Sequence, residues 1–365
     1  MKPALIQTSQ ALERLCEDLG HESIIAVDTE FAREHSYYPR LGLVQIAGGE
    51  HIACIDPLAV DIGPALSPLL LDTSVTKIFH ACLQDLEVIW HTLGLLPCPI
   101  HDTQLAAALM SEDHQISYAN LVEQETGTKL AKTETRTDWL RRPLSPAQLE
   151  YAADDVRYLE PLYRIQVEQL AHLQRGDWLR QDCEQLCSSP EVRFAPELNG
   201  CWKRVRGAHR LQGLELALVE RIAAWREHRA VEQDLTRRRI LPDDLVIEIA
   251  SRRPANSSEL ARVGRVQSLL DNDQLVSLAD ELNHTYAMGP DKWPSSLRFK
   301  PDAEQASSLK RVLEQLRRCA ADLGISPGML CNRKDAEILV AGRRDLPVLQ
   351  GWRHEAIGKD LLAML

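Results

Sequence analysis

The feature that most constrains the fold is an apolar run that ends in two carboxylates. Residues 24–31 read Ile-Ile-Ala-Val-Asp-Thr-Glu-Phe. Such a run predicts a strand that is buried on both faces of a sheet. Alternate side chains of a strand share a face, so Asp28 and Glu30 point the same way. Their repulsion would be offset by a divalent cation with oxygen ligands, such as Mg²⁺ or Mn²⁺. The alternative is a surface strand end with two solvated acids.

The composition is that of an ordinary globular protein. The chain has 365 residues, of which 44% are hydrophobic and 26% charged, and this length suits two or three domains. We find no signal-peptide pattern and no apolar stretch of membrane-spanning length. The nine cysteines form no CxxC pair, so we expect thiols in a reducing compartment. The sequence therefore predicts a cytoplasmic protein with no membrane partner, and we expect a monomer.

The charge distribution bears on the partner. A net charge of −11 argues at first against binding to nucleic acid. Acids outnumber bases two to one in residues 1–200, however, whereas bases exceed acids in residues 201–365. This asymmetry is compatible with polyanion binding by the second half.

The order of the predicted elements indicates a mixed sheet with helices packed on it. The expected strands cover residues 24–31, 41–47, 51–57 and 77–80 and the vicinity of Ile100, the first three as a meander. The expected helices cover residues 5–19, 66–71 and 103–110, a further helix begins within residues 81–85 and runs to about residue 93, and the pattern stays helical as far as residue 173. Strands followed by alternating strands and helices are typical of a sheet covered by helices.

Three further side chains could join the two acids of residues 24–31. Asp85 falls at a strand-to-helix junction, where the helix N-terminus favours an anionic group. Tyr151 and Asp155 lie four residues apart in a helical pattern and therefore share a face. Taken singly, each has a structural explanation, as a helix-terminal acid or as a helix-surface pair.

Together, Asp28, Glu30, Asp85, Tyr151 and Asp155 resemble the DEDDy branch of 3′–5′ exonucleases. The surrounding sequence is most similar to the ribonuclease D family. The supporting motifs are VDTEF at 27–31, YYP at 37–39, LGLVQ at 41–45, HACxxDLE at 80–87, WxxRPL at 139–144 and YAADDV at 151–156. They follow the order of the family over roughly residues 20–165. Position 150, where the sister branch has His, is Glu, which favours the Tyr branch.

The resemblance implies a fold and a mechanism. The fold is an α/β ribonuclease H-like mixed sheet with flanking helices. Two divalent ions about 4 Å apart activate water and stabilise the leaving oxygen in such enzymes. The resemblance implies that Asp28 bridges two Mg²⁺ or Mn²⁺ ions, with Glu30 and Asp155 completing one site. Asp85 would support the second ion through water. Tyr151, with an ordinary pKa near ~10, would orient the attacking water rather than act as a base.

Residues near the last motif are candidate RNA contacts. Arg136, Trp139 and Arg142 match a similar run in ribonuclease D-like chains. Arg side chains suit phosphate, and Trp suits base stacking. The alternative is a buried Trp with Arg residues on the surface. The neighbouring polar residues expected to pack or orient, rather than to bind metal, are His80, His101 and Asp102.

The second half resembles small helical nucleic-acid-binding modules. Residues 211–254 resemble an HRDC domain, with Thr236 where that pattern usually has Pro, and residues 309–365 suggest a second copy. The predicted organisation is an exonuclease domain at 1–190, a linker at 191–208, and two all-α HRDC-type domains at 209–290 and 300–365. The candidate phosphate contacts are Arg237, Arg238 and Arg239, together with the basic pairs 252–253, 310–311, 317–318 and 343–344. For any one pair, a solvated helix face is the alternative.

The predicted function is a metal-dependent 3′–5′ exoribonuclease that releases nucleoside 5′-monophosphates. By resemblance, its substrates are tRNA precursors and other small structured RNAs with single-stranded 3′ ends. One alternative is a DNA-directed 3′–5′ exonuclease, because the two-metal site does not need the 2′-hydroxyl. The other is a catalytically inert RNA-binding adaptor.

Overall fold

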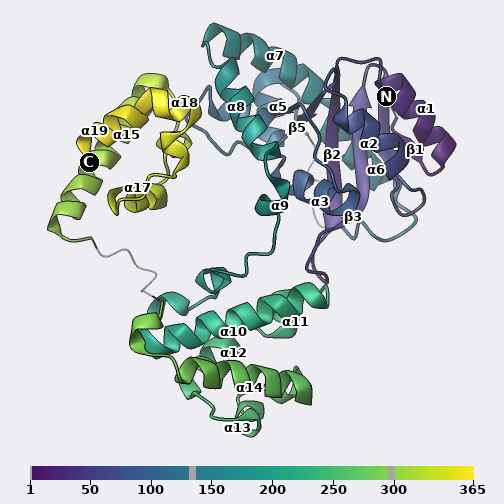
Figure 1. Cartoon of the computed structure of the whole chain (residues 1–365). Coiled ribbons are helices and arrows are strands. Elements are labelled where there is room, and N and C mark those ends of the chain that lie inside the picture. The colour runs from purple at the N-terminus through teal and green to yellow at the C-terminus, as the bar shows by residue number, and fades with distance from the viewer. Residues whose placement is uncertain (1, 131–136, 295–300) are drawn as a thin grey trace. The chain divides into compact units, whose positions relative to one another are not determined.

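The computed structural model describes residues 2–130, 137–294 and 301–365 (Figure 1). It divides into two compact units. The first, which we call the sheet unit, comprises Met1–Ala32, Pro39–Pro190 and Pro301–Leu365. The second, which we call the helical unit, comprises Arg33–Tyr38 and Glu191–Lys300.

The sheet unit is built on a six-stranded mixed sheet in the order β1-β4-β3-β2-β5-β6. The strands are β1 (Ala4–Ile6), β2 (Ile24–Ala32), β3 (Arg40–Gly48), β4 (His51–Ile55), β5 (Thr76–Phe79) and β6 (Ile100–Asp102). β2, β3 and β4 form an antiparallel meander. β1 pairs parallel with β4, and β5 and β6 extend the sheet parallel to β2. The predicted meander and the mixed sheet are confirmed.

The prediction for the first residues was wrong. Residues 5 and 6, expected at the start of a helix over 5–19, belong instead to strand β1. They pair with residues 54 and 55 of β4, a contact that local periodicity cannot reveal. Helix α1 (Ser9–Leu19) begins only after Thr8, whose side chain accepts a hydrogen bond from the Ala11 amide as an N-cap.

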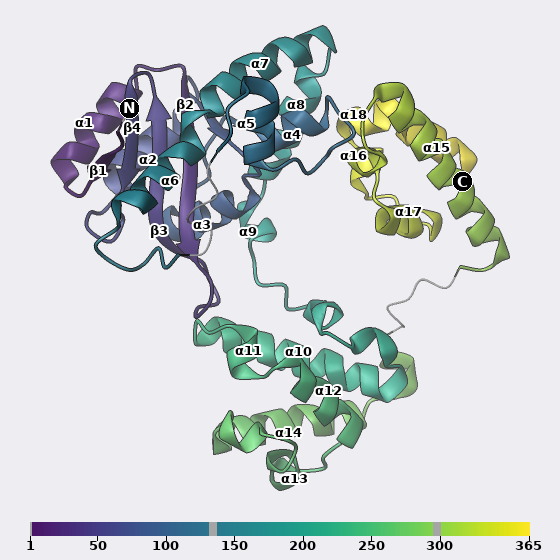
Figure 2. The ribbon, with the colours of Figure 1, turned by 180° about the vertical axis from the view of Figure 1, so that it is seen from behind.

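Helices cover both faces of the sheet. The helices before residue 200 are α1, α2 (Gly63–Leu71), α3 (Leu83–Leu93), α4 (Thr103–Ala108), α5 (Tyr118–Thr126), α6 (Pro146–Arg157), α7 (Leu159–His172), α8 (Gly176–Cys187) and α9 (Pro190–Arg193). On one face, Ile24 and Ala26 of β2 pack with Val156 of α6 and Leu159 of α7. On the other face lies α1, because a Cβ on Gly48 would meet both Leu19 and Ile25. Figures 1 and 2 show this unit from opposite sides.

The C-terminal helices belong to the same unit and dock on α8. They are α15 (Ala303–Leu323), α16 (Pro327–Leu330), α17 (Arg333–Val340), α18 (Gly351–Arg353) and α19 (Lys359–Met364). The rings of Trp352 and Trp178 stack with centroids 4.4 Å apart. Arg353 donates to both carboxylate oxygens of Asp182, at 2.5 and 3.0 Å, and Arg175 donates to the Leu323 carbonyl at 2.6 Å. Long-range polar and aromatic contacts therefore hold this segment.

The helical unit has its own core. Its helices are α10 (Gly213–Glu232), α11 (Arg237–Ile240), α12 (Asp243–Arg252), α13 (Ser257–Ala261) and α14 (Asn272–Tyr286). The residues buried around α10 include Leu218, Ile222 and Trp225. Residues 201–208, which we expected in a linker, contribute Trp202 and Val205 to this core. The division into an exonuclease domain, a linker and two HRDC-type domains stays a prediction.

A buried acid ties residues 33–38 into the helical unit. The side chain of Glu227 is fully buried and accepts hydrogen bonds from Tyr37 Oη at 2.5 Å and from the Arg237 guanidinium. Burial works to raise the pKa of Glu227, but the hydrogen bonds from Arg237 and Tyr37 outweigh it and leave the pKa lowered. Asp234 accepts from the amides of Tyr37 and Tyr38 at 3.0 and 3.1 Å.

Two further expectations concern the cysteines and the possibility of a membrane-spanning helix. The nine cysteines all lie within the described ranges and form no disulfide, as predicted. Among the described residues, no helix is both long and apolar enough to cross a membrane.

Candidate active site and nucleic-acid interface

Strand β2 presents two acids toward helix α6. Asp28 and Glu30 lie on the same face of β2 as Ile24 and Ala26, which pack under α6 and α7. Both carboxylates are largely withdrawn from solvent, although they stand near the end of the strand. The pairing register with β3 shifts between Glu30 and Phe31, so the regular ladder is interrupted just beyond Glu30.

Helix α6 supplies the third acid. Its start is fixed by Pro146 in the first turn and by a capping box between Ser145 and Gln148. Its last turn is fixed by Tyr118, whose hydroxyl donates to the Asp154 carbonyl at 2.9 Å. These constraints leave Asp155 over β2. Carboxylate oxygens of Asp28, Glu30 and Asp155 all lie within 4.8 Å of one another, which makes them a candidate metal-binding group.

The pKa values of these three carboxyl groups indicate that a bound cation would stabilise their ionised forms. Burial raises the pKa of Asp28 to about 7, partly opposed by the Thr29 backbone amide. Burial, and then the charge of Asp28, raises the pKa of Glu30 to about 8. Burial, followed by the charges of Asp28 and Glu30, raises the pKa of Asp155 to about 9. All three carboxylates are therefore costly to ionise together. Because the donors are all oxygens, the group fits a hard divalent ion such as Mg²⁺ or Mn²⁺.

Asp85 stands beside this group and has a partner of its own. It lies in the first turn of α3, as predicted for a helix-terminal acid. Thr29 Oγ1 donates to Asp85 Oδ1 at 2.5 Å. Burial, and then the charge of Asp28, raises the pKa of Asp85 well above its ordinary value. Sequence reasoning missed Thr29, whose position between Asp28 and Glu30 points its side chain to the opposite face of the sheet.

Tyr151 projects from α6 one turn before Asp155. Burial raises the pKa of its hydroxyl, and the charges of Asp155, Glu30 and Asp28 raise it further. The hydroxyl therefore stays protonated at neutral pH and can donate a hydrogen bond, whereas it is a poor base. Its ring lies 6.2 Å from that of Trp139, centroid to centroid.

The residues before α6 are mostly structural. Trp139 is 5% exposed and packs with Leu43 and Ala152. A Cβ on Gly42 would lie only 2.8 Å from the Trp139 carbonyl oxygen, so this close approach needs glycine. Arg142 donates to both carboxylate oxygens of Asp56, at 2.7 and 2.8 Å. These contacts favour the alternative of a buried Trp, with Arg142 held in an ion pair. Arg136 lies outside the described residues.

The neighbouring polar residues orient the backbone, as expected. His80 contacts Thr103 Oγ1 at 2.9 Å and the Ile116 carbonyl at 3.2 Å. Asp102 accepts from the backbone amides of residues 81, 82, 104 and 105. His101 contacts the amide oxygen of Gln166. These interactions fix the ends of β5 and β6.

A basic cavity lies in the helical unit. Its volume is about 650 Å³. The basic residues that line it are Arg204, Arg206, Arg226, Arg237, Arg238 and Arg265, and Asp243 and Asp244 are also in its wall. Arg237 is engaged by Glu227, and Arg239, outside this cavity, contacts His35 at 3.0 Å. Within the described part of the chain, Arg206 and Arg238 form no ion pair.

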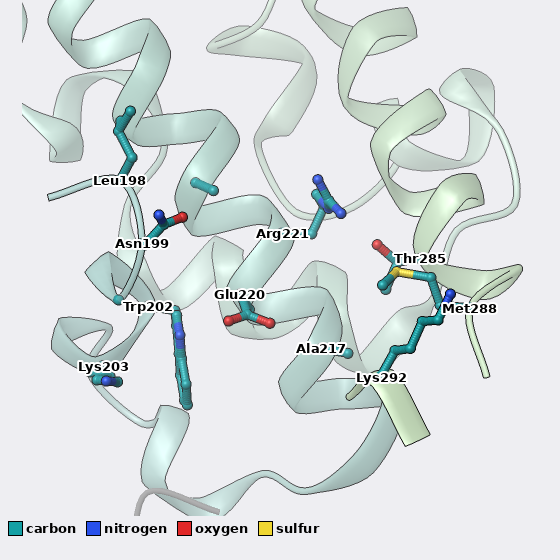
Figure 3. A pocket seen from close by; sticks show the side chains of 12 residues that line it. Leu198, Asn199, Trp202, Lys203, Ala217, Glu220, Arg221, Thr285, Met288 and Lys292 are labelled. Carbon is teal, nitrogen blue, oxygen red and sulfur yellow. The ribbon is translucent and has the colours of Figure 1, made fainter. Parts of the chain in front are cut away.

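A second pocket of the helical unit has a more mixed lining. Figure 3 shows this pocket, of about 410 Å³, with Lys203, Arg221 and Lys292 around Glu220. Arg221 pairs with Glu281 at 3.3 Å. Trp202 also lines the pocket, but it is 5% exposed and offers little ring surface for stacking. The arginine-lined cavity is therefore the stronger candidate for an anionic ligand.

Comparisons with known proteins agree with this geometry. The family model of the 3′-5′ exonuclease matches residues 3–171, and that of the HRDC domain matches residues 215–271. Ribonuclease D of Sphingobium indicum is 35% identical over 369 residues, which cover 99% of this chain and 94% of that protein. Ribonuclease D of Pseudomonas paraeruginosa is 34% identical over 374 residues, with 99% and 96% covered.

A solved structure extends the similarity to the whole fold. It is the crystal structure of Escherichia coli RNase D, described as an exoribonuclease involved in structured RNA processing. The TM-score is 0.85 at 30% identity, and the match covers 100% of this chain and 99% of that one.

Proposed function

Because the chain belongs to the ribonuclease D family and is a 3′–5′ exoribonuclease, we propose that it trims the 3′ ends of tRNA precursors and other small structured RNAs in a metal-dependent reaction. The products are nucleoside 5′-monophosphates. The observation that carries the proposal is the group of three carboxylates between β2 and α6.

The oxygen donor set supports binding of divalent metal ions, and the family resemblance implies two of them. Asp28, Glu30 and Asp155 would hold the ions through their carboxylate oxygens, and Asp85 would support them from the start of α3. When bound, the ions supply an activated water and stabilise the leaving oxygen of the phosphodiester. Before the ions bind, the raised pKa values mean that the three carboxylates retain protons near neutral pH. Loading the site therefore releases protons.

Tyr151 has a positioning role in this proposal. Tyr151 lies one helical turn before Asp155, and its protonated hydroxyl would donate a hydrogen bond to the attacking water. The packing of its ring near Trp139 limits the directions that the hydroxyl can take. The hydroxyl thus orients the water, while the carboxylates provide the negative charge that holds the ions.

The arginine-lined cavity of the helical unit would hold the RNA backbone. Arg206 and Arg238 line it, and neither forms an ion pair within the described ranges. Arginine suits phosphate because its planar guanidinium presents several donors. Such contacts position a nucleic acid without reading its sequence, and they weaken as salt concentration rises.

A cleavage assay tests the catalytic part. The full chain is incubated with a 5′-labelled RNA that has a single-stranded 3′ tail, in Mg²⁺, Mn²⁺ or EDTA, beside Asp28→Ala. We expect a ladder that shortens from the 3′ end and is lost in EDTA and in the variant. A DNA strand of the same sequence runs in parallel. Activity that survives EDTA or Asp28→Ala refutes the metal assignment, and faster cleavage of DNA refutes the substrate class.

A binding assay tests the helical unit. In Asp28→Ala, which cannot turn over, the further change of Arg206 and Arg238 to Ala should weaken RNA binding. It should reduce the slope of log affinity against log salt by about 1 to 2. Arg229→Ala and Arg262→Ala together remove two bases of the same unit that do not line the cavity, and this double variant serves as the control. An equal effect in the control would show that only net charge matters.

A further inference from the structure

Gln45 is a buried amide whose hydrogen bonds are not satisfied. Its side chain is 0% exposed, and neither Nε2 nor Oε1 has a hydrogen-bond partner among the described residues. Buried polar atoms without partners are uncommon because each one costs free energy. The other fully buried glutamine shows the usual arrangement, since Gln166 donates to the Thr103 carbonyl at 2.8 Å and contacts His101 at 3.2 Å. The burial of Gln45 therefore needs a functional or structural explanation, whereas the hydrogen bonds of Gln166 already explain its burial.

The strand register places Gln45 beside the candidate metal site. Gln45 on β3 is directly opposite Asp28 on β2 and opposite Cys54 on β4. Side chains of directly opposed residues lie on the same face, with Cβ atoms about 4.5–5.5 Å apart. Two residues along β3 on that face, Leu43 packs against Ala152 of α6. Gln45 therefore lies on the face of the sheet that α6 covers, across from Asp28. Figures 1 and 2 show the strands β2 and β3 and the helix α6 that form this layer.

We propose that Gln45 is a positioning residue for the metal site, and that its amide donates to the Asp28 carboxylate, directly or through one water. The inference rests on the proposed metal-dependent function. A carboxylate that binds an ion keeps lone pairs that need a donor, and such a donor fixes its orientation. An amide provides N–H donors without adding charge to a place where three carboxylates already meet. The acceptor that Gln45 Nε2 lacks is thus one that the loaded site would supply.

Two matched substitutions test this role in the full chain. Gln45→Leu removes an unpaired buried amide, and Gln166→Leu removes a paired one. For each, Mn²⁺ affinity is measured by titration calorimetry, and metal-free stability is measured by urea denaturation in EDTA. We expect Gln45→Leu to weaken Mn²⁺ binding by about 10- to 100-fold, as for other partners of metal ligands, without lowering metal-free stability. We expect Gln166→Leu to lower metal-free stability and to leave Mn²⁺ affinity unchanged.

The outcomes separate this inference from the proposed function. Gln45→Met, which is unbranched and similar in size, provides the same comparison if the Leu variant does not fold. Unchanged Mn²⁺ affinity in the Gln45 variant overturns the positioning role while leaving the proposed function intact. A loss of metal-free stability equal to that of Gln166→Leu also overturns it, because the amide would then have structural partners. If the unmodified chain binds no Mn²⁺, the proposed function fails, and this inference fails with it.

Discussion

The substitution Asp155→Asn tests how much the repulsion among the three carboxylates destabilises the metal-free folded state. In the chain without metal, Asp155 faces both Asp28 and Glu30, with carboxylate oxygens within 4.8 Å. Two unit charges at that distance repel by about 3 kcal/mol at an effective dielectric constant of about 20. The amide has nearly the same shape but no charge. At pH 8 and without metal, the unfolded chain ionises Asp155 freely, whereas the folded chain must either bear this repulsion or keep the Asp155 carboxyl protonated well above its ordinary pKa. We therefore expect Asp155→Asn to be more stable than the unmodified chain by about 3 kcal/mol.

The raised pKa values determine how the stability difference between the two proteins changes with pH. The pKa values of Asp28, Glu30 and Asp155 are raised to about 7, 8 and 9, above ordinary values of 3.8 to 4.5. The folded state therefore binds protons more tightly than the unfolded state does. The resulting stability is fully present below about pH 4, near the unfolded pKa values, and is lost as the pH rises through 7 to 9. The difference between the two proteins should shrink toward zero as the pH falls to about 4.5.

The assay is urea denaturation in EDTA, followed by circular dichroism at pH 5 and pH 8. Asp154→Asn is the control, because Asp154 pairs with Arg157 at 2.8 Å on the same helix and is not part of the carboxylate group. It should lower stability by about 1 kcal/mol or less. Saturating Mn²⁺ should stabilise the unmodified chain and reverse the order of the two proteins. If Asp155→Asn is no more stable than the unmodified chain at pH 8 in EDTA, the electrostatic reasoning is refuted.

Three other substitutions test neighbouring parts of the molecule. Tyr151→Phe removes the hydroxyl that orients water and should lower kcat by about 10- to 100-fold with unchanged Mn²⁺ affinity; an unchanged kcat would exclude this role. Arg353→Ala leaves the buried Asp182 carboxylate without its main partner, at a cost of about 3 kcal/mol, and limited proteolysis should detect release of the C-terminal helices. Glu227→Ala leaves Arg237 without its carboxylate partner and should destabilise the helical unit near pH 7 by about 3 kcal/mol in thermal unfolding. Because the pKa of Glu227 is lowered, this effect should fade as the pH falls below 4.5, and a constant effect would contradict the ion-pair explanation.

Local patterns were enough to predict the elements that carry the site. The apolar run before Asp28 determined β2, and the i, i+2 spacing placed Glu30 on the same face. The i, i+4 spacing likewise placed Tyr151 and Asp155 on one face of α6. Both periods are properties of the backbone, so they can be read from the sequence wherever the element type is known. The order of the motifs indicated the family.

Contacts between distant residues were decided only by the tertiary structure. β1 forms because residues 4–6 pair with β4, and no local pattern distinguishes this segment from the start of a helix. The stacking of Trp178 on Trp352 joins segments that are far apart in the chain. Gln45 shows the same limit within the site, because its apolar neighbours predict a strand but not which residue lies across from it. Side-chain partners across a sheet or between helices depend on register and docking, which are set by the packing of the whole core rather than by short-range periodicity.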